Sequence, residues 1–215
     1  MMDLGNVLIL GDSYSTFEGY NPEGYDVWYS KNDNGMTDVR DVTETWWHLL
    51  LSEGGASLVR NSSFSGTTVC HTGYNGSDCR GDSFVGRLDR LIESGFFKKN
   101  TIDTFFIFGL TNDCWAGSPV GEEKFADFSP SDLYSVAPAF SYMLKRAIEA
   151  AEGARIIFIM NYGLTDKLFS IAKNACSHFG IEFLPLSEFE VNEGHPTVRG
   201  MREIKEQVSA YLEKE

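Results

Sequence analysis

The sequence predicts a three-layer α/β/α sandwich with a parallel sheet as its middle layer. Short apolar runs alternate with amphipathic helical patterns along the whole chain. Parallel strands joined by right-handed helical crossovers produce this architecture. Residues 104–109 and 155–160 are apolar almost throughout, which is typical of strands covered by helices on both faces. The 215 residues contain no internal repeat, low-complexity tract or linker, so we expect a single domain over residues 1–215.

Five short apolar segments are the predicted strands: VLIL (7–10), SLVRN (57–61), TFFIFG (104–109), RIIFIM (155–160) and IEFLPL (181–186). Between them, apolar residues recur at the i, i+4, i+7 spacing of one buried helix face. These stripes predict helices over residues 84–92, 133–148, 168–179 and 198–212, with a further helix near 43–52. Pro138 falls inside the second stripe and is expected to kink or divide that helix. Glycines that follow helical stretches predict left-handed caps at Gly54, Gly95, Gly153 and Gly180.

Composition and charge argue against several kinds of partner. The formal net charge is −13, whereas a nucleic-acid partner requires a basic surface. No apolar run approaches the roughly 20 residues that a membrane span needs. The four cysteines lack paired C-x-x-C spacing and are too few for a disulfide scaffold, so neither a zinc site nor a disulfide framework is indicated.

The cysteines and the N-terminal stretch also bear on the cellular compartment. Free thiols are the expectation, with a bridge between Cys70 and Cys79 left open. MMDLGNVLIL has neither a basic segment nor a small-residue cleavage site, which predicts a cytoplasmic protein. The doubled Met leaves an exported parent with a trimmed signal as the alternative.

Two connections are much longer than a joint between a strand and a helix. About thirty residues separate the first strand from the helix near 43–52, where two to six are usual. The segment TVCHTGYNGSDCRGDS (68–83) follows the second strand. Both connections leave the carboxyl ends of strands, the edge at which open α/β sheets bind ligands. The first one is rich in aromatic residues: Tyr14, Phe17, Tyr20, Tyr25, Trp28 and Tyr29.

Four polar motifs fall at that edge. In VLILGDSYS (7–15) a buried strand stops at a tight turn, which would project the Ser13 hydroxyl above the sheet, near backbone N–H groups that can stabilise an oxyanion. Gly66 in NSSFSGTT would let a backbone N–H approach a ligand. The Asn112 amide in FGLTNDCWAG could donate to developing negative charge. His195 in VNEGHPTVRGM precedes the last helix and could shuttle a proton.

Each motif also has an ordinary structural explanation. The Asp-Ser pair can cap a loop, the glycine can serve a turn, and the Asn-Asp pair can form an Asx turn. The histidine can be an exposed side chain without a role. The motifs favour a common site because each comes just after a strand or just before the last helix.

In this order the motifs resemble the blocks of the GDSL/SGNH hydrolase family, which is named for a serine, a glycine, an asparagine and a histidine. LILGDSYS is similar to the first block, NSSFSG to the second, GLTND to the third and NEGHP to the fifth. The resemblance implies a flavodoxin-like fold with five parallel strands in the order 2-1-3-4-5. It also implies that Ser13 is the nucleophile and His195 the general base. The implied oxyanion hole consists of the N–H groups of Ser13 and Gly66 and the side chain of Asn112.

Two positions depart from the family pattern. The third block usually reads G-x-N-D, and here Leu110 holds the glycine position. The fifth block usually reads D-x-x-H, and Asn192 stands where an aspartate would orient His195. An amide can hold an imidazole but cannot stabilise an imidazolium as a carboxylate does. We therefore expect the Glu193 carboxylate to support His195, with Glu190, Asn192 or a backbone carbonyl as alternatives.

The function predicted is that of a serine esterase that removes a small acyl group, for example acetyl, from a small-molecule or carbohydrate ester without metal or cofactor. Tyr14 and Trp115 could offer flat faces to a substrate or could pack as a lid. Loss of the orienting carboxylate supports a second hypothesis, a non-catalytic carbohydrate-binding relative. A third is an FMN-binding, flavodoxin-like electron carrier, but Asp12 would then lie unfavourably beside the phosphate.

Overall fold

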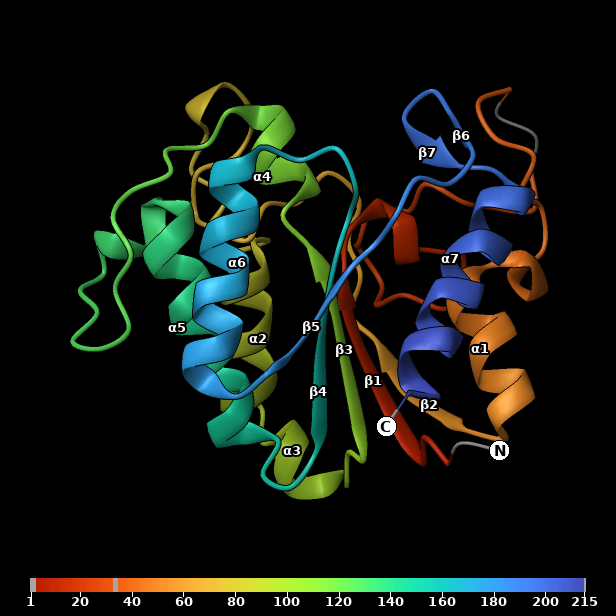
Figure 1. Cartoon of the computed structure of the whole chain (residues 1–215), viewed down its shortest axis with the longest axis horizontal. Coiled ribbons are helices and arrows are strands. Elements are labelled where there is room, and N and C mark those ends of the chain that lie inside the picture. Colours follow the sequence, from red (N-terminus) through yellow and green to blue (C-terminus); the bar gives the residue numbers. More distant parts are fainter. Residues whose placement is uncertain (1–2, 33–34, 215) are drawn as a thin grey trace.

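The computed structural model describes residues 3–32 and 35–214, and it confirms the α/β/α sandwich and the predicted strand order (Figure 1). Five parallel strands form one sheet in the order β2-β1-β3-β4-β5. All six residues of the central strand are buried, whereas most residues of the edge strand β2 are partly exposed. The strands are β1 (Asn6–Gly11), β2 (Ser57–Asn61), β3 (Thr104–Gly109), β4 (Arg155–Met160) and β5 (Glu182–Pro185).

Helices cover both faces of the sheet, and alternate residues of each strand point to opposite layers. On one face, Leu8 and Phe105 pack against α2 (Phe84–Glu93), α5 (Val136–Ala150) and α6 (Asp166–Phe179). On the other face, Val7 and Phe106 pack against α1 (Trp46–Gly54) and α7 (Val198–Leu212). The two apolar layers fix the sheet between them, so its carboxyl edge is a rigid platform for the site.

Two expectations about helix ends are wrong. Helix α5 begins at Val136, so Pro138 lies in its first turn, where the missing N–H has no intrahelical partner to lose. The helix is therefore neither kinked nor divided there, and Leu133 belongs to a separate 3-10 turn, Asp132–Tyr134. Gly54 is the last residue of α1, and the left-handed cap is Gly55, with a φ of 62°.

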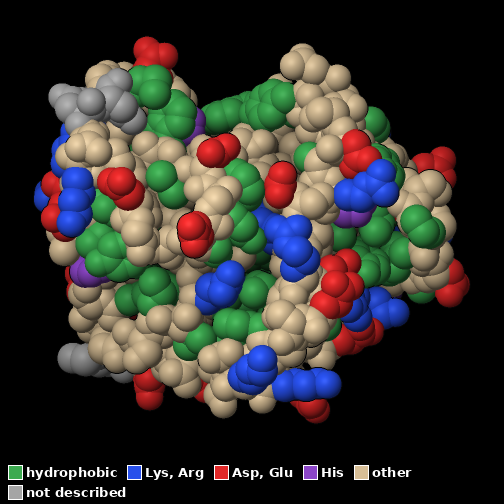
Figure 2. All heavy atoms as spheres, turned by 180° about the vertical axis from the view of Figure 1, so that it is seen from behind, with side chains coloured by type: hydrophobic (Ala, Val, Ile, Leu, Met, Phe, Trp, Pro, Cys, Tyr) green, Lys and Arg blue, Asp and Glu red, His purple; other side chains and the backbone are tan. Residues whose placement is uncertain are grey.

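The carboxyl ends of the strands lie at the top of Figure 1, together with three small elements that the sequence patterns do not predict. They are α4 (Thr111–Ala116) after β3, and the two-stranded hairpin β6 (Val191–Asn192) and β7 (His195–Pro196). Short α3 (Phe96–Lys99) lies at the opposite end. Seen from behind, the molecule is hollowed at this top edge (Figure 2). None of the helices in the described part of the chain is both long and apolar enough to span a bilayer.

Candidate active site

Ser13 lies directly beyond the end of β1, in the short 3-10 turn Ser13–Ser15. The Asp12 carboxylate caps this turn by accepting the Tyr14 N–H at 3.1 Å. Burial raises the pKa of Asp12 to about 7, opposed by that hydrogen bond and by the charge of Arg87. Glycine is required at position 11, because a Cβ there would lie 2.6 Å from the Ser63 hydroxyl oxygen. The corner after VLIL is therefore too close-packed for a side chain at position 11.

His195 reaches Ser13 from the far end of the sequence. Its Nε2 lies 2.9 Å from the Ser13 Oγ, and both side chains are buried. The β6–β7 hairpin delivers the ring, since its two turn residues, Glu193 and Gly194, have φ values of 48° and 74°. Two consecutive left-handed residues give the tight hairpin turn that matches strand twist.

The other ring nitrogen of His195 is held by main chain. Its Nδ1 lies 3.1 Å from the carbonyl oxygen of Glu193, and the Glu193 side chain is exposed. The structure thus differs from the expectation that a Glu193 carboxylate supports the ring. The amide of Asn192 points elsewhere and donates to the Met36 carbonyl at 3.1 Å. The tight turn explains the difference, because it folds the Glu193 carbonyl back toward the imidazole two residues later.

This partner assigns the tautomer of His195. A carbonyl oxygen only accepts hydrogen bonds, so Nδ1 carries the proton and Nε2 is left as the acceptor for the Ser13 hydroxyl. Burial lowers the pKa of His195, and the hydrogen bond to the Glu193 carbonyl partly opposes this effect. The ring is therefore a neutral base aimed at a serine hydroxyl.

The side chain of Asn112 offers a buried hydrogen-bond donor at the same edge. Its Oδ1 accepts the Tyr74 hydroxyl at 2.8 Å, which directs the Nδ2 group the other way. Within residues 3–32 and 35–214, no partner satisfies the buried Nδ2 atom. Leaving a buried donor without a partner costs free energy, and the Nδ2 group can donate a hydrogen bond to a bound ligand.

Leu110 explains how Asn112 is presented. It has a φ of 74°, a left-handed conformation that costs a residue with a side chain roughly 1 kcal/mol or more. This is the position at which the family pattern has glycine, so the leucine adopts the backbone turn that glycine would adopt freely. Helix α4 then begins at Thr111 and places Asn112 in its first turn.

Gly66 lies on the loop after β2, also with a φ of 74°. Open space surrounds the site of its absent Cβ, so backbone conformation alone favours glycine here. Asp113 ties this loop to α4, accepting the N–H groups of Val69 at 2.8 Å and Cys70 at 3.2 Å. Burial raises the pKa of Asp113 to about 6, and these two hydrogen bonds oppose the shift. The loop and the asparagine are thereby fixed relative to each other.

A family model described as GDSL-like Lipase/Acylhydrolase matches residues 5–212. The chain belongs to this family. Like the family, it is an ester hydrolase. No curated protein matches the chain.

Solved structures agree with the GDSL-like assignment. A protein from Bacteroides ovatus ATCC 8483, assigned as a GDSL-like lipase, is 40% identical with a TM-score of 0.92, and all of each chain is covered. Another so assigned, from Bacteroides uniformis ATCC 8492, is 39% identical with a TM-score of 0.90, covering 98% of this chain and 96% of that one. An acetyl xylan esterase from Butyrivibrio proteoclasticus shares the fold at 15% identity and a TM-score of 0.63, covering 100% of this chain and 64% of its own.

One residue that sequence reasoning missed, Arg87, fastens the strand ends beneath the site of this GDSL-like hydrolase. Its fully buried guanidinium donates to the carbonyls of Gly11, at 3.0 Å, and Ser62, and to the Thr67 hydroxyl at 2.9 Å. Burial lowers its pKa to about 10, and nearby Tyr25 and Asp12 oppose the shift. The available signal was its position: an arginine three residues after Phe84 lies on the apolar stripe of α2.

The two residues predicted to contact substrate differ in exposure. Tyr14 is 2% exposed, and its hydroxyl donates to the Gly194 carbonyl at 2.6 Å and accepts from Asn161 at 3.2 Å. It therefore supports the hairpin that carries His195. Trp115 is 46% exposed, with its ring edge-on to His195 at 6.1 Å, and it stays a predicted substrate contact.

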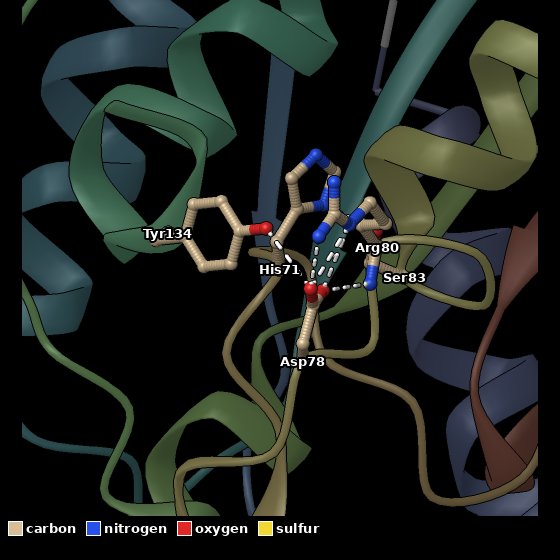
Figure 3. Close-up of polar contacts among 5 residues, drawn as sticks. All are labelled: His71, Asp78, Arg80, Ser83 and Tyr134. Carbon is tan, nitrogen blue, oxygen red and sulfur yellow. Dashed lines mark hydrogen bonds and ion pairs between the residues drawn. The ribbon is translucent and has the colours of Figure 1, made fainter. Parts of the chain in front are cut away.

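The loop that carries Tyr74 has its own polar cluster (Figure 3). Asp78 accepts from Arg80, and from the Tyr134 hydroxyl at 3.2 Å, while His71 Nδ1 lies 2.9 Å from the Ser83 hydroxyl. These contacts hold the loop in place against Tyr134 and Ser83. The four cysteines are free thiols, including Cys70 and Cys79 in this loop.

Proposed function

We propose that this ester hydrolase is a serine esterase with Ser13 as its nucleophile and His195 as its general base. The observation that carries the proposal is the 2.9 Å contact between Ser13 Oγ and His195 Nε2, with the tautomer held by a carbonyl. A hydroxyl beside a neutral imidazole acceptor is the arrangement that activates serine for attack on an acyl carbon.

The reaction proceeds in two halves. His195 Nε2 takes the proton as the Ser13 Oγ attacks the ester carbonyl, and the imidazolium then returns that proton to the leaving alcohol. Water, deprotonated by the same nitrogen, hydrolyses the acyl-enzyme and regenerates Ser13. The unsatisfied Nδ2 of Asn112, together with the N–H groups of Ser13 and Gly66, stabilises the oxyanion of each tetrahedral intermediate.

The proposed substrates are small acyl esters, acetyl esters of carbohydrates among them. The exposed Trp115 ring beside the catalytic histidine supports a flat sugar or a small apolar group at the site. The fold shared with an acetyl xylan esterase from Butyrivibrio proteoclasticus motivates the choice of acetylated carbohydrate.

Covalent trapping tests the nucleophile directly. A fluorophosphonate should label the parent protein once, at Ser13, as located by peptide mass spectrometry, and Ser13→Ala should remain unlabelled. Release of acetate from acetylated xylo-oligosaccharides by the parent but not by the variant would then support the substrate class. Sugar binding without labelling or turnover would instead favour the non-catalytic carbohydrate-binding relative.

A further inference from the structure

The imidazole of His195 lies flat on the indole of Trp28. Their ring centroids are 3.5 Å apart and their planes differ by 6°. It is the closest of the parallel ring pairs among the described residues; the next, Phe125 with His178, has centroids 4.2 Å apart. Tyr14 and Trp115 also approach His195, but both do so edge-on.

Trp28 is anchored to both halves of the serine–histidine pair. Its backbone N–H donates to the Thr16 hydroxyl at 2.9 Å, and that hydroxyl donates to the Ser13 carbonyl, also at 2.9 Å. The next residue, Tyr29, is buried and donates its hydroxyl to the carbonyl of Pro196 at 3.0 Å, beside His195. The indole is thus set in place by the same backbone that carries the two reacting side chains.

In the described part of the chain, the hydrogen-bond partners of the His195 ring include no carboxylate. The partner of His195 Nδ1 is a neutral carbonyl, which orients the ring but contributes no negative charge. Of the ionisable groups on the surrounding elements, Tyr14 meets the ring edge-on at 5.5 Å, and the Glu193 carboxylate is exposed. An aromatic face carries a negative quadrupole, and tryptophan attracts a desolvated cation more strongly than the other aromatic residues do.

We propose that Trp28 is a positioning residue that replaces the missing aspartate, its indole face holding the plane of His195 and stabilising the imidazolium formed during acyl transfer. The proposal rests on the proposed function in one respect only: the imidazolium forms during acyl transfer if Ser13 and His195 react as proposed. The stack itself leads to a separate physical prediction. The indole face should stabilise the protonated form of the His195 ring whether or not the protein turns over an ester.

The sign of a pKa change separates this role from simple burial. If the indole only excludes water, its removal should leave the pKa of His195 unchanged or raise it, because burial disfavours the charged ring. If the π face stabilises the cation, Trp28→Leu, which keeps apolar bulk, should lower that pKa by about one unit, a tenfold change in the protonation equilibrium. Trp28→Phe should restore most of the difference, since a benzene face remains.

NMR titration of the imidazole resonances measures these shifts in the parent, Trp28→Leu and Trp28→Phe. The His71 ring, which meets Tyr134 edge-on and lies in another loop, is the internal control, and its titration should not move. Trp115→Leu is the matched variant, because it removes an indole from the edge of His195 rather than from its face. In Trp115→Leu the pKa of His195 should not fall. An unchanged or raised pKa of His195 in Trp28→Leu would overturn the proposal.

Repeating the titration in a Ser13→Ala background separates the two proposals, because that variant cannot form an acyl-enzyme and the stack persists. In the Ser13-intact protein, kcat/KM for p-nitrophenyl acetate should fall about tenfold in Trp28→Leu and recover in Trp28→Phe, with the fall mainly in kcat. Equal kcat/KM in the parent and Trp28→Leu would overturn the role in catalysis. Turnover that survives Ser13→Ala would refute the proposed nucleophile and leave the titration result standing.

Discussion

Among the described residues, two serine–histidine pairs have the same separation, and we propose that only one of them is arranged for chemistry. Ser13 and His195 approach to 2.9 Å, as do Ser83 and His71. In both pairs the histidine is buried and burial lowers its pKa. Distance and burial alone therefore do not distinguish a nucleophile from a structural hydroxyl.

The difference lies in what else each serine and histidine must do. The Ser83 hydroxyl caps α2 by accepting the Gly86 N–H at 3.1 Å, so it serves the helix. The nearby Asp78 is engaged by Arg80 and Tyr134 (Figure 3). The pair that we propose to be catalytic instead lies at the same sheet edge as the unsatisfied amide donor of Asn112, and its histidine is fixed by a carbonyl on one nitrogen and an indole on one face. The two pairs therefore differ in their surroundings: the Ser83 hydroxyl is occupied as a helix cap, whereas the site of Ser13 contains a hydrogen-bond donor without a partner.

The largest effects should come from removing the two serine hydroxyls in turn. Ser13→Ala should reduce p-nitrophenyl acetate hydrolysis by about 10⁴-fold or more, because the nucleophile is lost. Ser83→Ala should keep turnover but lower the free energy of unfolding by about 1–3 kcal/mol, since a helix cap and a buried imidazole lose their partner. Side-by-side rates and urea unfolding curves would measure both. The reverse pattern would exchange the roles of the two pairs.

Asn112→Ala should have the next largest effect, a fall of about 10²- to 10³-fold in kcat, because an oxyanion donor is removed. Tyr74→Phe is the matched control, since it leaves the Asn112 Nδ2 donor in place and removes only the hydroxyl that orients it. We expect Tyr74→Phe to cost less than Asn112→Ala. Steady-state kinetics on the same ester would measure both variants, and equal kcat in the parent and Asn112→Ala would remove Asn112 from the oxyanion hole.

The pH dependence of turnover should reflect the environment of His195. Burial holds the pKa of His195 below its ordinary value of 6.5, and only the neutral ring can accept the Ser13 proton. Activity should therefore persist as the pH falls through 6.5 and be lost only below it, where the ring becomes protonated. A plot of log kcat/KM against pH checks this, and an acid limb centred above 6.5 would show that stabilisation of the imidazolium outweighs the effect of burial.

Glu193→Gln should have the smallest effect on turnover. The contact to His195 Nδ1 comes from the Glu193 backbone carbonyl, which the substitution leaves in place. Its kcat should match that of the parent within about twofold, consistent with an exposed side chain. Gly194→Ala is the informative partner, because φ is 74° there and a side chain would strain the turn that delivers the carbonyl. A marked loss of kcat in Glu193→Gln would restore the carboxylate to the site.

Much of this architecture could be predicted from local patterns. Near-continuous apolar runs such as Thr104–Gly109 predicted the central strands, and the spacing of Leu168, Ile171 and Ala175 predicted α6. Helix ends were less predictable, because Pro138 is compatible with a first turn as well as with a kink. Periodicity reports which face of an element is buried, but it carries little information about the residue at which the element begins.

The sequence by itself determined the layered fold, the strand segments and the family blocks that contain Ser13, Gly66, Asn112 and His195. Only the tertiary structure decided what surrounds them. The Glu193 carbonyl reaches Nδ1 because two left-handed residues close the β6–β7 turn, and the indole of Trp28 covers His195 because loop and hairpin share hydrogen bonds. Main-chain groups are the same at every position and ring stacking joins segments far apart in the chain, so neither leaves a local signature in the sequence.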